Sequence, residues 1–302
     1  MKSFVLAIAI ALLAIAIAEG VVRTLRSRDY DWRAFLVSLF DLTGTIGMRL
    51  IAPIGLASPV FAYAYEYRLF SFELITVWQF ALLFIGQEFC YYWFHRASHR
   101  VRWFWASHNV HHSPEQICFA AAFRLGITSR IAGSTLFYVP LAWLGFDPQV
   151  VLLTLTINLF YQFWIHADWI PKLGWLEYVL NTPSHHRVHH ARNLEYLDAN
   201  YGGVLIVFDR LFGSFIPERE GVPCDYGLLT AAPSYNPIKV ELHGWTSLAK
   251  DLWRSRSARE AFGYLFMPPG WSPNGDAATT EVLRKRAAAA RPPLAASEAI
   301  GF

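Results

Sequence analysis

The sequence predicts an all-α protein: a polytopic membrane helical bundle of about 4–5 spans with a helical cap on its cytosolic side. Hydrophobic residues make up 54% of the 302 positions and charged residues only 16%, whereas about a quarter of a soluble domain is charged. Several apolar runs are followed by polar segments rich in histidine. Helices satisfy their backbone hydrogen bonds internally, so they are the element that such a chain favours.

Charge and cysteine content argue against several other classes of protein. The formal net charge is +3, which gives no indication of nucleic-acid binding. The three cysteines, Cys90, Cys118 and Cys224, lie far apart and form no C-x-x-C pair. A disulfide framework or an iron–sulfur site is therefore not expected.

The first apolar run covers residues 3–18, directly after Lys2. It is shorter than the roughly 20 residues that a span needs, and Ala16-Ile17-Ala18 also fits a signal peptide. We interpret the run as a retained first membrane helix because further apolar runs follow it. The sequence leaves open whether residues 1–18 are cleaved.

Two further segments lead to the first histidines. Residues 34–64 are apolar but contain Asp41, Arg49 and two prolines. They form either one kinked span or a span followed by a re-entrant piece. Residues 74–94 are apolar and aromatic, and predict a long helix that runs directly into His95.

Residues 131–146 and 149–165 are two more apolar runs, separated by the turn signal Gly145-Phe146-Asp147-Pro148. They predict a helical hairpin that crosses the bilayer and returns. The return places His166 on the same side of the bilayer as the earlier histidines.

The arginine distribution predicts which side that is. Residues 20–33 contain four arginines, whereas the loop at 66–73 contains only Arg68. Counting the spans back from the histidines places the arginine-rich segment on the histidine side. Because cytoplasmic loops are enriched in lysine and arginine, the histidines are predicted to face the cytoplasm.

We divide the chain into N-terminal membrane helices at 1–72, a histidine-rich domain at 73–217 and a cytosolic C-terminal part at 218–302. Residues 287–299 predict a disordered tail. Residues 238–266 predict surface helices with an apolar edge for packing or interfacial anchoring: Trp245, Leu248, Leu252 and Trp253.

The histidines are clustered in sequence. Ten of the eleven lie in boxes at residues 95–99, 108–112 and 185–190, or at the isolated position 166. Side chains three or four residues apart share one helix face, so each box can direct two or three imidazoles at one point. Imidazole binds Zn, Cu, Fe and Ni, and eight imidazoles exceed the four ligands of one zinc ion. The spacing therefore predicts a two-metal site; exposed or core histidines would leave the repeated H-x-x-H-H unexplained.

Polar residues within the predicted spans are candidates for function because they are costly there. Glu88 precedes His95 by seven positions and shares its helical face. Asn158, Gln162 and His166 are spaced by four and form one polar stripe. We expect these residues either to orient metal ligands or to form interhelical hydrogen bonds.

Polar residues after the third box are candidates for orienting it. Asp198, Asn200 and Asp209 follow within about twenty positions of the box. Their alternative role is to cap helices and stabilise turns.

The boxes resemble those of a known family, the fatty acid hydroxylase / sterol desaturase superfamily of membrane di-iron enzymes. The similar stretches are YWFHRASH, WASHNVHHSPE and NTPSHHRVHHARN, within residues 75–217. The third of these, with the following DANYGGVLIVFDRLFGSF, is close to the alkylglycerol monooxygenase branch and its bacterial relatives.

The resemblance implies a helical membrane domain whose cytoplasmic cap holds two Fe ions and uses O₂ as co-substrate. His185 is expected to lie behind the ligands. The chain departs from related patterns at Ile170, where many fatty acid hydroxylases have histidine, and at Arg100, where alkylglycerol monooxygenases have an acidic residue. The implied ligands are His95, His99, His108, His111, His112, His166, His186, His189 and His190.

The implied reaction is hydroxylation or desaturation of the alkyl part of a membrane lipid, which could be a fatty acyl lipid, a sterol or an ether lipid. The chain has no flavin, haem or iron–sulfur motif, so an electron-transfer partner or a soluble reductant such as a pterin must supply electrons. The similarity to bacterial members implies the bacterial inner membrane.

Two other functions fit a chain rich in histidine. A zinc-dependent membrane hydrolase would have a carboxylate base inside a box, as in H-E-x-x-H, and these boxes contain none. A metal transport or binding protein would place its ligands near the bilayer midplane, whereas these boxes lie at the ends of the predicted helices.

Overall fold

The computed structural model describes residues 2–51, 57–73, 76–230 and 234–290, and within these residues the chain is helical and has no β-strand. The predicted all-α class is confirmed. The α-helices are α1 Lys2–Arg26, α2 Trp32–Ile51, α3 Ser58–Glu66, α4 Val77–Arg100, α5 Arg102–His108, α6 Val139–Leu144, α7 Pro148–Trp164, α8 Pro183–His190, α9 Val207–Leu211, α10 Pro237–Arg254, α11 Ala258–Phe266 and α12 Thr280–Ala290.

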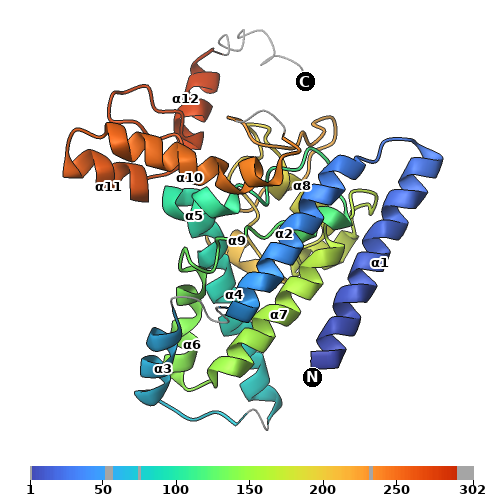
Figure 1. Cartoon of the computed structure of the whole chain (residues 1–302), viewed down its shortest axis with the longest axis vertical. Coiled ribbons are helices and arrows are strands. Elements are labelled where there is room, and N and C mark those ends of the chain that lie inside the picture. The colour runs from blue at the N-terminus through green and yellow to red at the C-terminus, as the bar shows by residue number, and fades with distance from the viewer. Residues whose placement is uncertain (1, 52–56, 74–75, 231–233, 291–302) are drawn as a thin grey trace, which may run out of the picture.

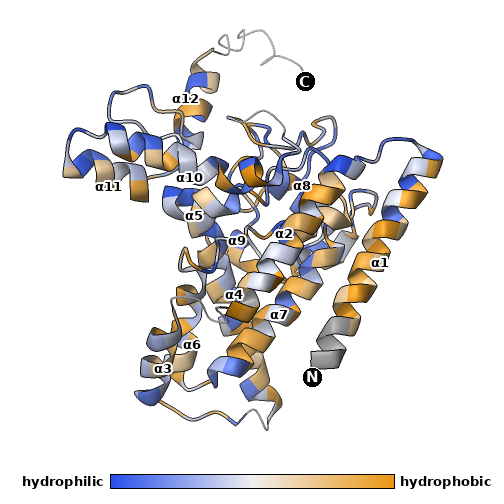
Figure 2. Cartoon of the chain, viewed as in Figure 1, coloured by the Kyte–Doolittle hydropathy of each residue, from blue (hydrophilic) through white to orange (hydrophobic). Residues whose placement is uncertain are grey.

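Four long helices, α1, α2, α4 and α7, form an elongated half of the molecule (Figure 1). α1 runs toward the end where the histidine boxes lie, α2 runs back, and α4 and α7 run toward that end again. Hydrophobic residues dominate α1, α2 and α7 (Figure 2). Many of these apolar side chains are exposed, among them Leu25 of α1 and Leu50 of α2. In α4, Val77 at the start of the helix is 86% exposed.

One helix in the described part of the chain, at Ala7–Arg26, is both long and apolar enough to cross a membrane. The predicted run at 3–18 therefore extends by two further turns, with Arg23 and Arg26 in the last turn, where the helix dipole favours cations. α7 has only 17 residues, and charged and histidine residues lower the hydropathy of α4. A polytopic bundle of 4–5 spans thus remains a prediction.

The segment 34–64 forms a long helix, α2, and a short one, α3. The side chain of Asp31 begins α2 by accepting hydrogen bonds from the backbone N–H groups of Arg33 and Ala34. Residues 52–56, which include Pro53, lie outside the described residues, so the choice between a kinked span and a re-entrant piece stays a prediction.

The predicted first arm of the hairpin, residues 131–146, is not one helix. It consists of a 3-10 turn at Ser134–Tyr138 and the six-residue α6. Gly133 has a φ of +92° and Pro140 lies in the first turn of α6, so neither continues a helix from the residues before it. The segment nevertheless runs from the histidine end to the far end of the molecule (Figure 1).

The predicted turn at 145–148 is confirmed. Gly145 ends α6 with a φ of +124°, and a Cβ at this position would lie 2.2 Å from the carbonyl oxygen of Phe70. Asp147 then begins α7 by accepting hydrogen bonds from the N–H groups of Gln149 and Val150. α7 therefore returns the chain to the histidine end.

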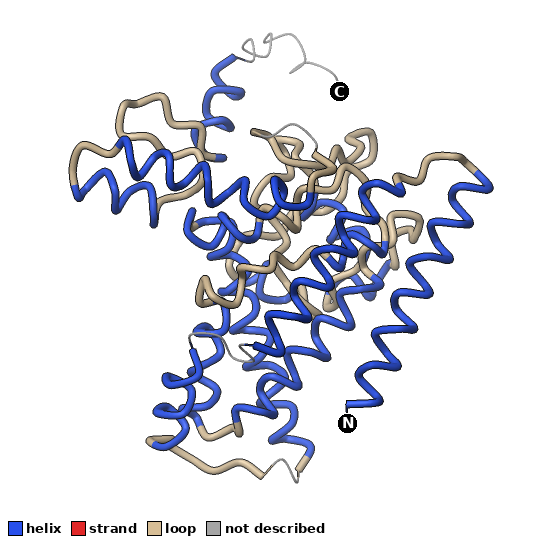
Figure 3. The backbone as a smooth tube through the Cα atoms, viewed as in Figure 1, coloured by secondary structure: helices blue, strands red, loops and turns tan. Residues whose placement is uncertain are grey.

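Loops gather at the histidine end, whereas the opposite half is mainly helical (Figure 3). A core between α3, α4, α6 and α7 contains Phe61, Leu83, Tyr138 and Phe146. A second core joins α1 and α2 to the 3-10 turn Phe119–Phe123. These cores lie below the histidines and hold α4 and α7 in place.

The C-terminal part forms the surface helices α10 and α11, as predicted, and they pack against α5. Their apolar edge is divided: Leu248 is buried, whereas Trp253 is 91% exposed. The predicted tail at 287–299 was wrong for residues 287–290, which continue α12 because alanine is the best helix former. Residues 291–299 lie outside the described residues.

Candidate metal centre

Nine histidines meet at one end of the four long helices. They come from the last turns of α4, from the end of α5 and the turn that follows it, from the turn just after α7, and from α8. They form a first cluster of five and a second cluster of four, and in each the possible ligand atoms lie within 4.8 Å of one another. The first cluster is His95, His99, His108, His112 and His189; the second cluster is His111, His166, His186 and His190.

Neighbouring residues contribute to different clusters. His111 belongs to the second cluster and His112 to the first, and His189 and His190 divide in the opposite order. Consecutive side chains of a helical turn point about 100° apart, so one segment serves two adjacent points. The rings of His112 and His190 are stacked at 4.5 Å between centroids, so the two clusters are in contact.

The ring nitrogens converge at short distances. His95 Nε2 and His108 Nε2 are 3.1 Å apart in the first cluster. In the second cluster, His186 Nε2 lies 3.0 Å from His166 Nε2 and 3.1 Å from His190 Nε2.

Backbone carbonyl groups determine which nitrogen of four rings carries the proton. His95 Nδ1 lies 2.8 Å from the oxygen of Tyr201, and His166 Nδ1 lies 2.8 Å from that of Gln162. His111 and His189 make the same contact with Arg124 and Ala199, each at 2.9 Å. A carbonyl oxygen only accepts, so Nδ1 donates and Nε2 carries a lone pair.

The clusters fit metal ions because the ring nitrogens of neighbouring imidazoles face one another, and His95 and His166 each direct an unprotonated Nε2 into their cluster. The Nε2 atoms of His99, His112 and His189 are also buried, and have no hydrogen-bond partner in the described structure. A buried polar atom without a partner is costly. A cation at the centre of each cluster would satisfy these atoms, and each cluster has enough imidazoles for one ion.

Burial favours the neutral form of the imidazoles in the second cluster, which is the form that binds a metal. It lowers the pKa of His111 to about 4 and that of His166 to about 3. It also lowers the pKa of His186 and His190 well below the usual value, and the neighbouring histidines lower them further. The centre therefore presents unprotonated nitrogens at neutral pH.

The polar residues after the third box hold the loop that orients two ligands. Asp209 accepts hydrogen bonds of 2.7 Å from the N–H groups of Tyr201 and Gly202. Asn200 donates to the carbonyl oxygens of His185 and Ile216. The predicted candidates thus lie behind the histidines, and the carbonyl groups of this loop contact His95 and His189.

Asp198 contacts the first cluster directly. Its Oδ1 lies 3.4 Å from His99 Nδ1, and its Oδ2 pairs with Arg100 at 3.0 Å. Hydrogen bonds from His99 and Thr280 and the positive charge of Arg100 lower the pKa of Asp198 in spite of its burial. Arg100, a position of departure from the alkylglycerol monooxygenase pattern, therefore holds the carboxylate beside His99.

The polar groups within α4 and α7 form one network. Glu88 accepts hydrogen bonds from the side chain of Asn158 and, at 2.8 Å, from the N–H groups of Val204 and Leu205. Gln162 accepts a bond from Tyr91, while its backbone oxygen accepts from His166. Glu88 and Asn158 join the helices, and Gln162 contacts a histidine of the second cluster.

His185 belongs to neither cluster. Its Nε2 lies 3.9 Å from Glu177 Oε2, and its ring packs against Phe215. His185 and His186 are consecutive residues of α8, so their side chains point about 100° apart.

Sequence reasoning missed Arg124. Its side chain is buried and donates to Ser38 and Ala34 of α2 and to Ser113 beside the second box, while its carbonyl oxygen accepts from His111. No local pattern marks this arginine, because its partners are up to 90 positions away.

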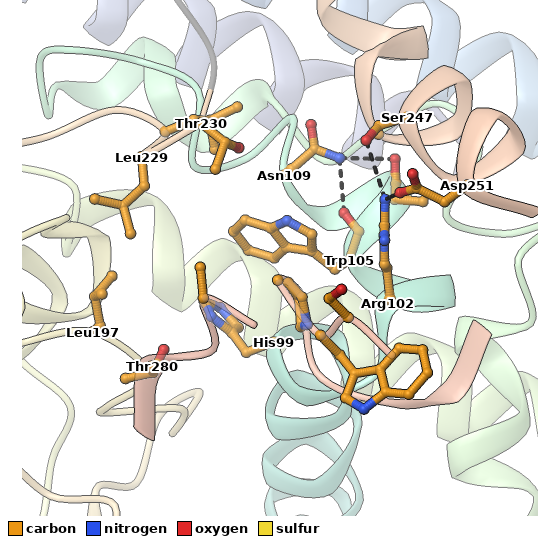
Figure 4. A pocket seen from close by; sticks show the side chains of 18 of the residues that line it. His99, Arg102, Trp105, Asn109, Leu197, Leu229, Thr230, Ser247, Asp251 and Thr280 are labelled. Atoms are coloured by element: carbon orange, nitrogen blue, oxygen red, sulfur yellow. Dashed lines mark hydrogen bonds and ion pairs between the residues drawn. The ribbon is translucent and has the colours of Figure 1, made fainter. Parts of the chain in front are cut away.

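A cavity of about 790 Å³ adjoins the first cluster. It is lined by His99, His112, His189 and His190, together with side chains from α10, α11 and residues 269–283. Trp105, Leu197 and Leu229 face it beside His99 (Figure 4). Arg102 on its wall donates to Ser247 at 3.1 Å and pairs with Asp251.

These features define a helical protein with two adjoining histidine clusters suited to two metal ions. Residues 80–214 match the family model described as Fatty acid hydroxylase. This part of the chain belongs to the fatty acid hydroxylase / sterol desaturase superfamily.

Three relatives describe the range of similarity. The chain is 44% identical over 214 residues to alkylglycerol monooxygenase of Homo sapiens, which covers 70% of this chain and 47% of the relative. It is 40% identical over 208 residues to that of Xenopus tropicalis, covering 69% and 46%. It is 27% identical over 189 residues to ornithine lipid hydroxylase OlsE of Rhizobium tropici, covering 60% and 57%.

The chain spans about half the length of the curated relatives that it matches. No solved structure matches it.

Proposed function

We propose that the chain is a membrane-bound, O₂-dependent di-iron enzyme that hydroxylates the alkyl part of a lipid. The observation that carries this proposal is the pair of buried histidine clusters with converging ring nitrogens. The relatives are a monooxygenase and a hydroxylase by name, and each name includes a lipid. These names favour hydroxylation over desaturation.

The first cluster would hold one iron and the second cluster the other. When bound, the irons would supply the activation of O₂ and the insertion of one oxygen atom into a C–H bond, with two electrons from an external donor. The chain itself orients the imidazoles through the carbonyl groups of Tyr201, Ala199, Arg124 and Gln162. Because these contacts fix the proton on Nδ1, Nε2 is free to bind metal.

The cavity is the chamber that we assign to the substrate. Trp105, Ala106 and Leu197 provide apolar wall near His99, where an alkyl chain can lie. Ser247, Arg254 and Glu260 lie on the wall formed by α10 and α11, where a polar headgroup can be solvated. The chamber therefore suits a lipid with one apolar and one polar part.

We further propose that α1, α2, α4 and α7 lie in the bilayer and that the clusters face the cytoplasm. Their exposed apolar side chains support the first part of this proposal. Arg23, from the arginine-rich segment, pairs with Asp168 beside the second cluster at 3.0 Å. The positive segment and the clusters thus share one side, as the positive-inside rule requires of a cytoplasmic site.

Metal analysis tests the proposal. The full chain, purified gently in detergent, should contain about two iron atoms, as two clusters of ligands imply, and should consume O₂ when given a lipid substrate. His111→Ala should lower the iron content, whereas His243→Ala, which changes a histidine outside both clusters, should not. One zinc per chain without O₂ consumption would overturn the proposal in favour of a zinc hydrolase.

A further inference from the structure

α10 and α11 carry large apolar side chains that the described part of the chain leaves exposed. Ile238, Leu242, Ala249 and Trp253 lie on one face of α10, at intervals that keep them within about 60° of one another. Trp253 is 91% exposed and Ile238 is 54% exposed. A surface helix of a soluble protein buries its apolar face and exposes its polar face, whereas α10 exposes an apolar face.

α11 repeats the pattern. Phe262 and Phe266 are one turn apart, their rings are 4.7 Å apart, and Phe262 is 60% exposed. We call the exposed apolar residues of the two helices the apolar stripe: Ile238, Leu242, Ala249, Trp253, Phe262 and Phe266.

The charges of the two helices are sorted by direction. Lys239 and Lys250 border the stripe on α10 and Arg259 borders it on α11; all three are exposed and form no ion pair within the described residues. The acidic residues turn inward: Glu241 is buried, Asp251 pairs with Arg102, and Glu260 lines the cavity. The outer surface is therefore apolar and positively charged.

The stripe continues onto a neighbouring segment. Trp245 on α10 donates to Thr128 at 2.8 Å and packs against Trp103, which donates to the oxygen of Ala132. Ile131 between these contacts is 43% exposed. Residues 128–132 begin the segment that runs alongside the long helices (Figure 1).

We propose that the α10–α11 pair lies on the surface of the bilayer, with the apolar stripe at the level of the lipid headgroups and its three cations against anionic lipid phosphates. α10 and α11 run across the direction of α1, α2 and α7 (Figure 1), as helices in the plane of a membrane would. A second copy of the chain is a poorer occupant, because a two-fold contact would bring the cations of both copies together.

This arrangement has a consequence for the cavity. The inward faces of α10 and α11 supply Ser247, Asp251 and Tyr264 to its wall. The same helices thus contact the lipid surface on one side and the cavity on the other. A lipid that enters the cavity then leaves the bilayer by only the thickness of this helix pair, about 10 Å.

Contact with lipid can be measured without turnover. Phe262→Cys in a Cys224→Ser background would carry a bimane label, since Cys90 and Cys118 are buried. The full chain would be placed in nanodiscs of phosphatidylcholine, with or without phosphatidylglycerol, that contain a lipid with a nitroxide near the headgroup. We expect about twofold or stronger quenching at position 262 than at an exposed control, Glu220→Cys. Equal quenching at both positions would overturn the proposal.

The charge requirement needs a second comparison. Phosphatidylglycerol should increase the quenching at position 262, because each cation near an anionic surface contributes about 1 kcal/mol, or roughly fivefold in affinity. The combined substitutions Lys239→Gln, Lys250→Gln and Arg259→Gln should remove this increase. Lys285→Gln with Arg286→Gln on α12 should leave it unchanged. If the quenching of the triple variant still depended on phosphatidylglycerol, the contact between the cations and lipid would be refuted. Two chains per disc with an unquenched label at position 262 would indicate that the stripe is a dimer surface instead.

Discussion

At the scale of single residues, the centre depends on pairs of neighbours that separate. His111 and His112 enter different clusters, and so do His189 and His190. Each cluster consequently draws on segments far apart in the chain, and the second and third boxes each contribute to both clusters. His166 is the one candidate ligand that lies outside a box. Substituting it therefore tests whether the second cluster binds a metal ion.

His166→Ala should abolish activity and lower bound iron, as should His111→Ala, because each removes an imidazole from the second cluster. His185→Ala is the matched control, since it changes a buried histidine that lies in neither cluster. Its metal affinity should fall by no more than the 10–100-fold typical of residues that only orient ligands. Iron content and turnover near wild type in His166→Gln would remove this residue from the site.

Glu88 is the residue whose loss should most disturb the network under the clusters. Glu88→Gln replaces an acceptor by a donor opposite the N–H groups of Val204 and Leu205 or the amide of Asn158. A buried donor without a partner costs about 1–3 kcal/mol, and chemical denaturation should show a loss of unfolding free energy of that size.

Glu66→Gln is the control for this substitution because Glu66 is exposed at the end of α3. A surface change of this kind is worth about 0.5 kcal/mol or less. Equal stability of the two variants would mean that Glu88 does not bear on the fold.

At the scale of elements, short helices and turns supply seven of the nine candidate ligands, and the long helix α4 supplies His95 and His99. α8 has eight residues, of which four are histidine and one is arginine. All five of these polar side chains are buried. An isolated helix of this length is unstable in water. We therefore expect the loop at 198–202 and bound metal ions to stabilise it.

Removal of metal should accordingly destabilise this end of the molecule first. An anaerobic chelator should lower the melting temperature, because a metal at about 100 times its dissociation constant contributes about 2.7 kcal/mol per site. Hydrogen exchange should increase in α8 and the loop at 198–202 before it increases in the lower parts of α4 and α7. Iron(II) should reverse both effects; an unchanged melting temperature after complete iron removal would contradict the stabilising role.

At the scale of the whole molecule, the arrangement of the long helices places the arginine-rich segment, all three boxes and His166 at one end. That arrangement holds even though residues 131–146 are not one helix, because the broken segment still runs to the far end and α7 returns. The direction of this end in a cell is a separate prediction.

Cysteine labelling in cells tests that direction. Glu115→Cys and Glu195→Cys, near the second and third boxes, are exposed and should both react only from the cytoplasm. Glu66→Cys at the opposite end should react only from the other side. Reaction of the two box positions from different sides would refute the return of the chain through α7.

The sequence by itself determined the helical class, the surface helices at 238–266 and the set of histidines that meet, because periodicity and residue chemistry are local properties. It also indicated the roles of Glu88, Asn158, Asp198 and Asn200 as polar groups near the boxes.

Only the tertiary structure decided how the nine histidines divide into two clusters, which carbonyl groups orient them, and that α10 and α11 line a cavity beside His99. Arg124 shows the physical reason: its partners in α2 are 86 and 90 positions away, and no short window of sequence contains such a contact.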